Sequence, residues 1–260
     1  MIRALWNSKS AMAAQQEKLD CISNNLANSS TEGYKREGVS FQDLMYENIN
    51  RLGYPTSSNS KTSQINGTGV KAANALRDNS QGNLLQTGVN CDFAIDGPGY
   101  FRVIQNDGSF AYERNGSFNV DGAGKLVDKN GNFLSIELTA AGKDINDKGG
   151  ISSDNFVVDK SGEISVKTGE TSVDYGKINL YNSIGDDSMM SIGNNQFITK
   201  PGANVYMEKN STVLQGLLEG SNVDVGKEMV DMIVAQRSFE FGSQGIKTAD
   251  EMWGLINNLK

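Results

Sequence analysis

The 260-residue sequence has no histidine, three prolines and only two cysteines. Without histidine the commonest general base and the imidazole metal ligand are both missing, so no Ser-His catalytic triad can form. Cys21 and Cys91 lie far apart in the chain and match no metal-ligand or redox spacing. Both are expected to be small buried apolar residues, with a disulfide left open. The composition therefore indicates no catalytic, metal or cofactor-binding residues.

Long basic runs and long apolar runs are missing too. The net charge is 24 − 31 = −7, and no Lys or Arg cluster could follow a phosphate backbone, so a nucleic-acid partner is not expected. No segment approaches the ~20 apolar residues that cross a bilayer. The start of the chain, from Arg3 to Glu17, has no uninterrupted apolar region, so a cleaved secretory signal is not expected.

The C-terminal segment carries a heptad pattern. Apolar residues recur every seven positions, with others three positions after members of that series: Val225, Met232, Ala235, Phe239, Ile246, Ala249, Trp253 and Ile256. Met229 is also expected to pack against another helix. This pattern predicts a helix that begins near 223–225, with Asp224 as its N-cap or as an acid of its first turn. Gly242 and Gly245 lie inside it, and each costs ~1 kcal/mol relative to alanine. The helix is therefore expected to need a partner.

The N-terminal segment carries a second heptad pattern. Its apolar positions predict an amphipathic helix over about residues 2–28, and they are Leu5, Met12, Leu19, Ile22 and Leu26. The periodicity leaves two arrangements open: a hairpin of the two helices within one chain, or packing between chains.

Between the helices the pattern changes to short alternating strands separated by Asp-Gly and Asn-Gly pairs, which favour tight turns. Strands are predicted at 92–96, 100–104, 110–114, 117–120 and 125–127 as an antiparallel meander, and again at 155–158, 163–166, 177–181 and 196–199. Residues 41–46 show a short apolar helical signal. Residues 47–69 are polar and predict an extended arm.

The predicted fold class is α+β, with N- and C-terminal heptad helices that pack together and an antiparallel β body, a sandwich or irregular barrel, inserted between them. Residues 1–46 plus 223–260 would form a terminal helical assembly domain, 47–69 a polar arm, and 70–222 the β-rich body.

Some residues also fit two other functions, a hydrolase and a secreted binding module. Asp186 with Asp187, or Asp121 with Asp128, could supply the carboxylate pair of a hydrolase, but Asp is also favoured in turns for backbone reasons. A secreted binding module with a helical stalk would bind ligand through the β body and would not polymerise. Neither function explains heptads at both ends.

Three motifs resemble the flagellar basal-body rod and hook family. The first is the N-terminal signature Asn24, Asn25, Leu26, Ala27, Asn28, Thr31, Gly33, Tyr34 and Lys35. The second runs from Asp92-Phe93-Ala94-Ile95-Asp96-Gly97 through Arg114-Asn115-Gly116-Ser117-Phe118. The third joins Gln215-Gly216, Leu218-Glu219, Ser221-Asn222-Val223 and Glu228-Met229-Val230. Ser29, Ser30 and Glu32 depart from the usual pattern in the turn after the first helix.

The resemblance implies a non-enzymatic axial subunit with no cofactor, exported through the flagellar type III channel without a cleaved signal and located outside the cytoplasmic membrane. Its implied partners are further copies of itself in a helical homopolymer, other rod and hook subunits, and the export apparatus. A bushing ring around the rod is a further candidate partner. No nucleic acid and no small-molecule substrate is expected.

The residues and the resemblance together suggest a mechanism of assembly. Weak helices at both ends are expected to become firm on contact with neighbouring copies, because burial of side chains such as Leu5, Met12, Phe239 and Trp253 yields about 1.5 to 3 kcal/mol each. Repeated head-to-tail contact that does not close produces an open filament.

Overall fold

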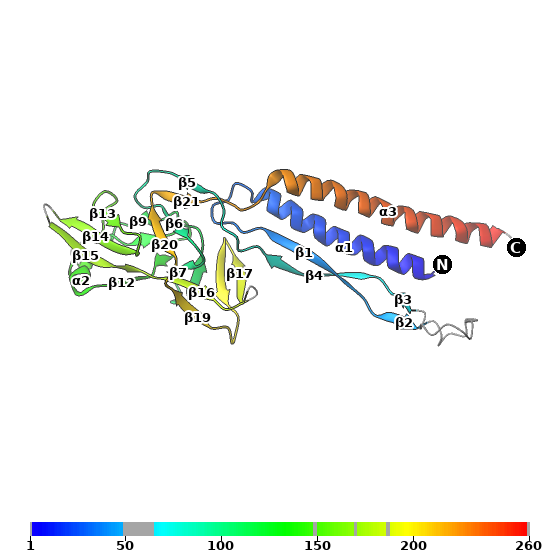
Figure 1. Cartoon of the computed structure of the whole chain (residues 1–260), viewed down its shortest axis with the longest axis horizontal. Coiled ribbons are helices and arrows are strands. Elements are labelled where there is room, and N and C mark those ends of the chain that lie inside the picture. Colours follow the sequence, from blue (N-terminus) through cyan, green and yellow to red (C-terminus); the bar gives the residue numbers. More distant parts are fainter. Residues whose placement is uncertain (1, 49–64, 148–149, 169–170, 186–187, 259–260) are drawn as a thin grey trace. The chain divides into compact units, whose positions relative to one another are not determined.

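The computed structural model describes residues 2–48, 65–147, 150–168, 171–185 and 188–258 (Figure 1). The chain divides into two compact units. Residues 1–27, 37–76 and 224–260 form a helical unit, and residues 28–36 and 77–223 form a β-rich unit. None of the described helices combines the length and apolarity needed to cross a membrane. Since both units are assembled from separate segments, each draws on residues that are distant in the sequence.

The helical unit is built on α1 (Ile2–Ala27) and α3 (Val225–Asn258), which pack against each other. They are antiparallel: Asn25 lies at Glu228, whereas Ser8 lies at Gly245. Both predicted helices are confirmed to within one residue at their predicted ends. The predicted cap is also confirmed, because Asp224 Oδ1 accepts a hydrogen bond from the Lys227 amide at 3.1 Å.

Two of the four glycines in α3, Gly242 and Gly245, lie against α1. A Cβ atom on Gly242 would lie 2.7 Å from Met12 Cγ, and one on Gly245 would lie 2.8 Å from Ser8 Oγ. The glycines therefore weaken the isolated helix but permit the close contact that replaces the lost stability. The structure thus contains the hairpin within one chain, one of the two arrangements that periodicity left open.

Two short antiparallel pairs complete the helical unit. Strand β1 (Glu37–Asp43) pairs with β4 (Val70–Arg77), and β2 (Tyr46–Asn48) pairs with β3 (Ile65–Gly67). The helical signal predicted over 41–46 is therefore wrong: pairing with distant backbone overrides the local spacing, as when the Leu44 amide donates to Gly69 O at 3.0 Å. The ends of the predicted arm 47–69 are strands, and its residues 49–64 lie outside the described part of the chain.

The β-rich unit contains a nine-stranded and a four-stranded antiparallel sheet. The nine strands are β7 (Tyr100–Ile104), β8 (Phe110–Glu113), β9 (Asn119–Val120), β10 (Leu126–Val127), β11 (Phe133–Leu134), β16 (Leu180–Ser183), β17 (Met189–Gly193), β18 (Gln196–Thr199) and β19 (Val205–Glu208). The order is β17-β18-β8-β7-β11-β10-β9, and β16 joins β7 to β19. The four-stranded sheet is β12 (Ile136–Leu138), β15 (Thr171–Ile178), β14 (Glu163–Thr168) and β13 (Phe156–Val158).

One core serves both sheets. Its fully buried side chains include Phe93, Phe101 and Phe118 beside Phe156 and Ile164 of the four-stranded sheet. Phe101 and Phe118 meet edge to face with centroids 5.6 Å apart. Together with the packed terminal helices, this antiparallel body confirms the predicted α+β fold class.

The predicted meander is correct only in part. β7 pairs with β8, and β9, β10 and β11 pair in order, but β6 (Phe93–Asp96) pairs with β20 (Thr212–Gln215) instead of β7. The Asp96-Gly97 turn does not close a hairpin, and Gly97 has φ +110° and faces Ser211. The sequence also missed α2 (Ala140–Asp147) and the pair of β5 (Leu84–Gln86) with β21 (Leu217–Glu219).

Candidate functional site

The predicted seam of the two terminal helices lies on the face where they meet. On α3, Ala235 and Ala249 are buried, and Met232, Phe239 and Ile246 are half-buried. On α1, Ile22 is buried, and Leu5, Met12, Leu19 and Leu26 are half-buried. Because these seam residues are covered within one chain, contact with another molecule would need other residues of the helices.

A second apolar face of α3 is uncovered. Its side chains are Val230 (60% exposed), Val234 (52%), Phe241 (70%), Met252 (45%) and Leu255 (65%). At 100° per residue they fall within a sector of about 60° that does not overlap the seam. We call these five residues the outer stripe. The heptad pattern did not predict this face, because its residues lie outside the a/d positions.

The end of α3 adds further exposed apolar surface. The helix has 34 residues and α1 has 26, a difference of 34 − 26 = 8 residues. Asn25 and Glu228 pair near the other end, so this excess lies at the C-terminal end of α3. There Trp253 is 48% and Ile256 53% exposed, although both continue the seam. Of the other predicted packing residues, Val225 and Met229 are also exposed.

The N-terminal signature begins at the end of α1, where Asn25 is fully buried. Its amide nitrogen donates to Glu37 O at 2.7 Å and to Glu228 Oε2 at 3.2 Å, and its Oδ1 accepts from the Glu37 amide at 3.0 Å. Asn25 therefore ties α1, β1 and α3 together. Its neighbours Asn24 and Ala27 are exposed, and Leu26 is half-buried.

The rest of the signature forms a turn on the β-rich unit. Asn28 O accepts from the Thr31 amide at 3.1 Å, and Thr31 O accepts from the Tyr34 amide at 3.3 Å. Gly33 adopts φ +67°, and a Cβ atom there would lie 2.7 Å from the Asn115 amide nitrogen. Only glycine fits this position without displacing backbone.

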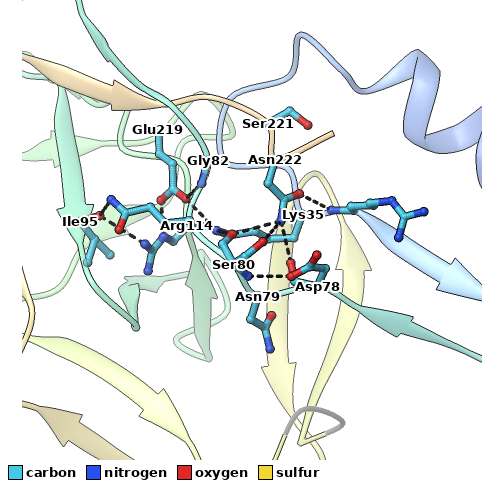
Figure 2. Close-up of polar contacts among 12 residues, drawn as sticks. Lys35, Asp78, Asn79, Ser80, Gly82, Ile95, Arg114, Glu219, Ser221 and Asn222 are labelled. Carbon is cyan, nitrogen blue, oxygen red and sulfur yellow. Dashed lines mark hydrogen bonds and ion pairs between the residues drawn. The ribbon is translucent and has the colours of Figure 1, made fainter. Parts of the chain in front are cut away.

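Lys35 ends the signature in a buried cluster of three charges (Figure 2). Its Nζ lies 2.7 Å from Glu219 Oε1, and Arg114 Nε donates to the other oxygen of that carboxylate. All three side chains are at most 4% exposed. Arg114 also donates to the carbonyl oxygens of Ile95, Gly97 and Gly99. The cluster therefore links the signature turn, the residue that follows β8, and β21.

Burial and charge act against each other in this cluster. Burial lowers the pKa of Lys35, and its hydrogen bond to Glu219 opposes that effect. Burial alone would raise the pKa of Glu219, but Arg114, Lys35 and the Gly82 amide hold that pKa below its ordinary value. The carboxylate is therefore retained in its charged form by its partners.

Asn222 lies beside this cluster and uses both ends of its side chain. Its Oδ1 accepts from the Arg36 amide at 2.7 Å, and its Nδ2 lies within hydrogen-bond distance of Asp78 O, Ser80 O and Ser80 Oγ. Arg114, Glu219 and Asn222 lie in the motifs that resemble the family. Their spacing in the sequence did not predict that they lie close to Lys35 in the fold.

A second buried acidic site lies in the nine-stranded sheet. Glu113 is 2% exposed, and its Oε1 has no hydrogen-bond partner. Asp128 is 7% exposed and accepts from the Asn130 and Asn132 amides and from Gln196 Nε2. Burial, and then the Asp128 carboxylate, raise the pKa of Glu113 to about 8. Glu113 is therefore largely protonated at neutral pH.

Glu113 should make the stability of the protein depend on pH. Its ordinary pKa is 4.5, so between pH 4.5 and 8 the folded state holds a proton that the unfolded state has lost. The free energy of unfolding should fall as pH rises through this window, by up to about 1.4 kcal/mol per pH unit from this residue. Urea unfolding at several pH values would measure the slope.

The matched variant is Glu113→Gln, which keeps the shape and removes the titrating group. Its free energy of unfolding should be nearly independent of pH between 5 and 8. A variant that kept the slope of the wild-type protein would show that another group causes it.

The aspartates and cysteines that could have supplied catalytic or metal-binding groups have structural roles where the structure describes them. Asp128 shapes a turn, and Asp121 is exposed beside another, while Asp186 and Asp187 lie outside the described residues. Within the described part of the chain neither cysteine forms a disulfide; Cys91 is buried as predicted, whereas Cys21 is only half-buried and donates to Glu37 O. Among the described residues, no three His, Cys, Asp or Glu side chains gather as metal ligands would.

Three family models match separate parts of the chain. "Flagella basal body rod protein" matches residues 5–35, which hold α1 and the signature turn. "Flagellar hook protein FlgE/F/G D1 domain" matches residues 94–166. "Flagellar basal body rod FlgEFG protein C-terminal" matches residues 214–259, which include β21 and α3. The matched regions therefore cover both terminal helices and a large part of the β body.

Relatives match over the whole chain. The "flagellar basal-body rod protein FlgG" of Borreliella burgdorferi is 35% identical over 100% of this chain and 99% of its own. Proteins with the same name from Buchnera aphidicola and Agrobacterium fabrum are 37% and 35% identical, each over 100% of both chains. The chain belongs to the flagellar basal-body rod family, whose members are structural subunits.

Proposed function

We propose that this protein is a subunit of the distal rod, which polymerises helically into a hollow shaft that transmits torque from the motor to the hook. The observation that carries self-assembly is the outer stripe of α3 together with the exposed apolar end of that helix. A row of exposed large apolar side chains on a helix marks a contact surface.

A second copy of the chain is the occupant we propose for this surface. Each copy presents Trp253 and Ile256 at one end of its hairpin, where the described residues of α1 leave them about half exposed. Contact between such an end and a different face of the next copy is head-to-tail and need not close into a ring. The terminal segments 1–46 and 223–260 would thus carry assembly, with residues 70–222 as the outer body.

The position in the distal rod rests on two supports. The names of the full-length relatives are those of a rod protein. Phe41-Gln42-Asp43-Leu44, followed by a polar segment, also favours the distal rod over the proximal rod and the hook. Hook or proximal-rod subunits remain the alternative within the family, and a secreted binding module is the alternative outside it.

The remaining properties follow from this proposal. The protein would have no enzymatic activity and no cofactor, and it would leave the cytoplasm through the flagellar export apparatus without losing a signal peptide. It would reside in the basal body outside the cytoplasmic membrane, in contact with other rod and hook subunits and with a bushing ring. No nucleic acid or small-molecule substrate would bind to it.

Electron microscopy of basal bodies from cells that lack this gene would test the proposal. Basal bodies without a distal-rod subunit should end in a short rod that carries no hook. Loss of a hook subunit would leave a complete rod, and loss of a proximal subunit would leave almost none. Restoring the gene should restore full length, and normal basal bodies in the deletion strain would support the binding-module alternative.

A further inference from the structure

The chain passes between its two units four times, after residues 27, 36, 76 and 223. On the β-rich unit, these passages start from only three segments: the signature turn 28–36, the segment that begins at Arg77, and the segment that ends at Val223. Every covalent connection between the units therefore leaves the β-rich unit from one of these three segments.

A single set of polar contacts holds the three segments together (Figure 2). Asn222, from the third segment, binds the Arg36 amide of the first at 2.7 Å and Asp78 O of the second at 2.9 Å. The first and second segments are also joined directly, because the Asp78 amide donates to Arg36 O at 2.8 Å. These contacts form a closed triangle.

Lys35 and Glu219 join the same segments a second time. Lys35 Nζ donates to Ser80 O and to Glu219 Oε1, both at 2.7 Å. The Gly33 amide donates to Glu219 O, and the Gly82 amide donates to Glu219 Oε1. The backbones are in close contact here, because a Cβ atom on Gly82 would lie 2.1 Å from Gly220 O. The contacts of Asn222 and those of Lys35 and Glu219 therefore each join all three segments.

We propose that Lys35, Arg36, Asp78, Ser80, Glu219 and Asn222 form a connector joint, a cooperative cluster that holds the three segments as one body and bears load in the working rod. The load-bearing part rests on the proposed function. A force that twists one unit against the other acts on the four covalent connections. If the contacts of the joint opened one at a time, these connections could move separately. Asn222 is a positioning residue, since its uncharged side chain contacts both of the other segments.

Asn222→Ala in the full-length purified protein tests whether the joint is cooperative. The variant directly removes the acceptor of the Arg36 amide. The amides of Gly33 and Asp78 keep their backbone acceptors, Glu219 O and Arg36 O. If the joint is cooperative, hydrogen exchange at Gly33 and Asp78 should also become about tenfold faster or more. Exchange at Val103 and Ala111 in the core should not change.

Asn210→Ala is the matched control, because Asn210 is an exposed asparagine on the same unit, outside the joint. It should leave all these exchange rates unchanged. If Asn222→Ala speeds exchange only at Arg36, the contacts open independently and the cooperative joint is excluded. Global loss of protection, including Val103 and Ala111, would also exclude it, because Asn222 would then support the whole fold.

Cells whose only copy of this gene carries Asn222→Ala test whether the joint bears load in the rod. They should build basal bodies of normal length and swim normally in dilute medium, but lose speed more steeply than wild-type cells as the medium becomes more viscous. Speed equal to wild type at all viscosities would refute load bearing while leaving the distal-rod function intact. Absence of hooks in this strain would refute it too, because the joint would then serve assembly.

Discussion

Phe241→Asp should stop assembly while the monomer stays folded. Phe241 is 70% exposed in the described structure, so the isolated chain loses little when the ring is removed. In the polymer the ring would be buried at a contact between copies, where burial of a phenylalanine yields about 1.5 to 3 kcal/mol and an unpaired carboxylate is strongly unfavourable. Because every subunit carries the change, the loss is repeated along the filament. Sedimentation, electron microscopy of basal bodies and motility would all measure it.

Two further variants make this result specific. Gln236→Asp places the same charge on an exposed position of α3 outside the outer stripe, and assembly should persist. Phe239→Asp changes a half-buried residue of the seam, so it should lower the helical content of the monomer itself as well as assembly. If the Phe241→Asp protein still formed rods of normal length, the outer stripe would not be a subunit contact.

The largest loss of stability is expected from Glu219→Gln. The glutamine keeps the size of the side chain but leaves Lys35 and Arg114 as two buried cations without a counter-charge. Removal of one partner from a buried ion pair typically lowers the free energy of unfolding by about 3 to 5 kcal/mol. Urea unfolding followed by tryptophan fluorescence alone would report mainly on the helices that hold both tryptophans, so circular dichroism of the β body should accompany it.

Glu163→Gln is the control for this prediction. Glu163 pairs with Lys177 at 3.6 Å, but both side chains are about half exposed, at 65% and 45%. The loss there should stay within about 1 kcal/mol, because water and salt screen an exposed pair. A similar small loss for Glu219→Gln would mean that the buried cluster relaxes or admits water. In a double-mutant cycle, Lys35→Met should recover part of the loss in the Glu219→Gln background.

The terminal helices could be predicted from the sequence because their signals are local. The seven-residue repeats and the Asp224 cap are patterns within one segment, and the structure reproduces them. Many strands were found for the same reason, since alternation and Asp-Gly turns are read over a few residues. The periodicity did not identify the partner of each helix, because an apolar seam packs equally well against a helix of the same chain or of another chain.

Contacts between distant segments could not be predicted. Strand β6 pairs with β20, and Glu219 meets Lys35 and Arg114 across 184 and 105 positions of the chain. A charged residue in a short strand looks the same in the sequence whether it is solvated or buried. The strands over 41–46 were misread because Phe41, Leu44 and Met45 also fit helical spacing, and only pairing with β3 and β4 decides between the two. The outer stripe was missed because its members do not follow the heptad.

The division of the chain into interleaved segments has a consequence for the order of folding. The helical unit needs residues near both ends of the chain, whereas all but nine residues of the β-rich unit come from the continuous stretch 77–223. When a polypeptide is delivered from its amino end, whether from a ribosome or through a narrow channel, α1 emerges first and α3 last. Helix α1 therefore cannot pack against α3 until nearly the whole chain has emerged. The hairpin forms late, after the β-rich unit is complete.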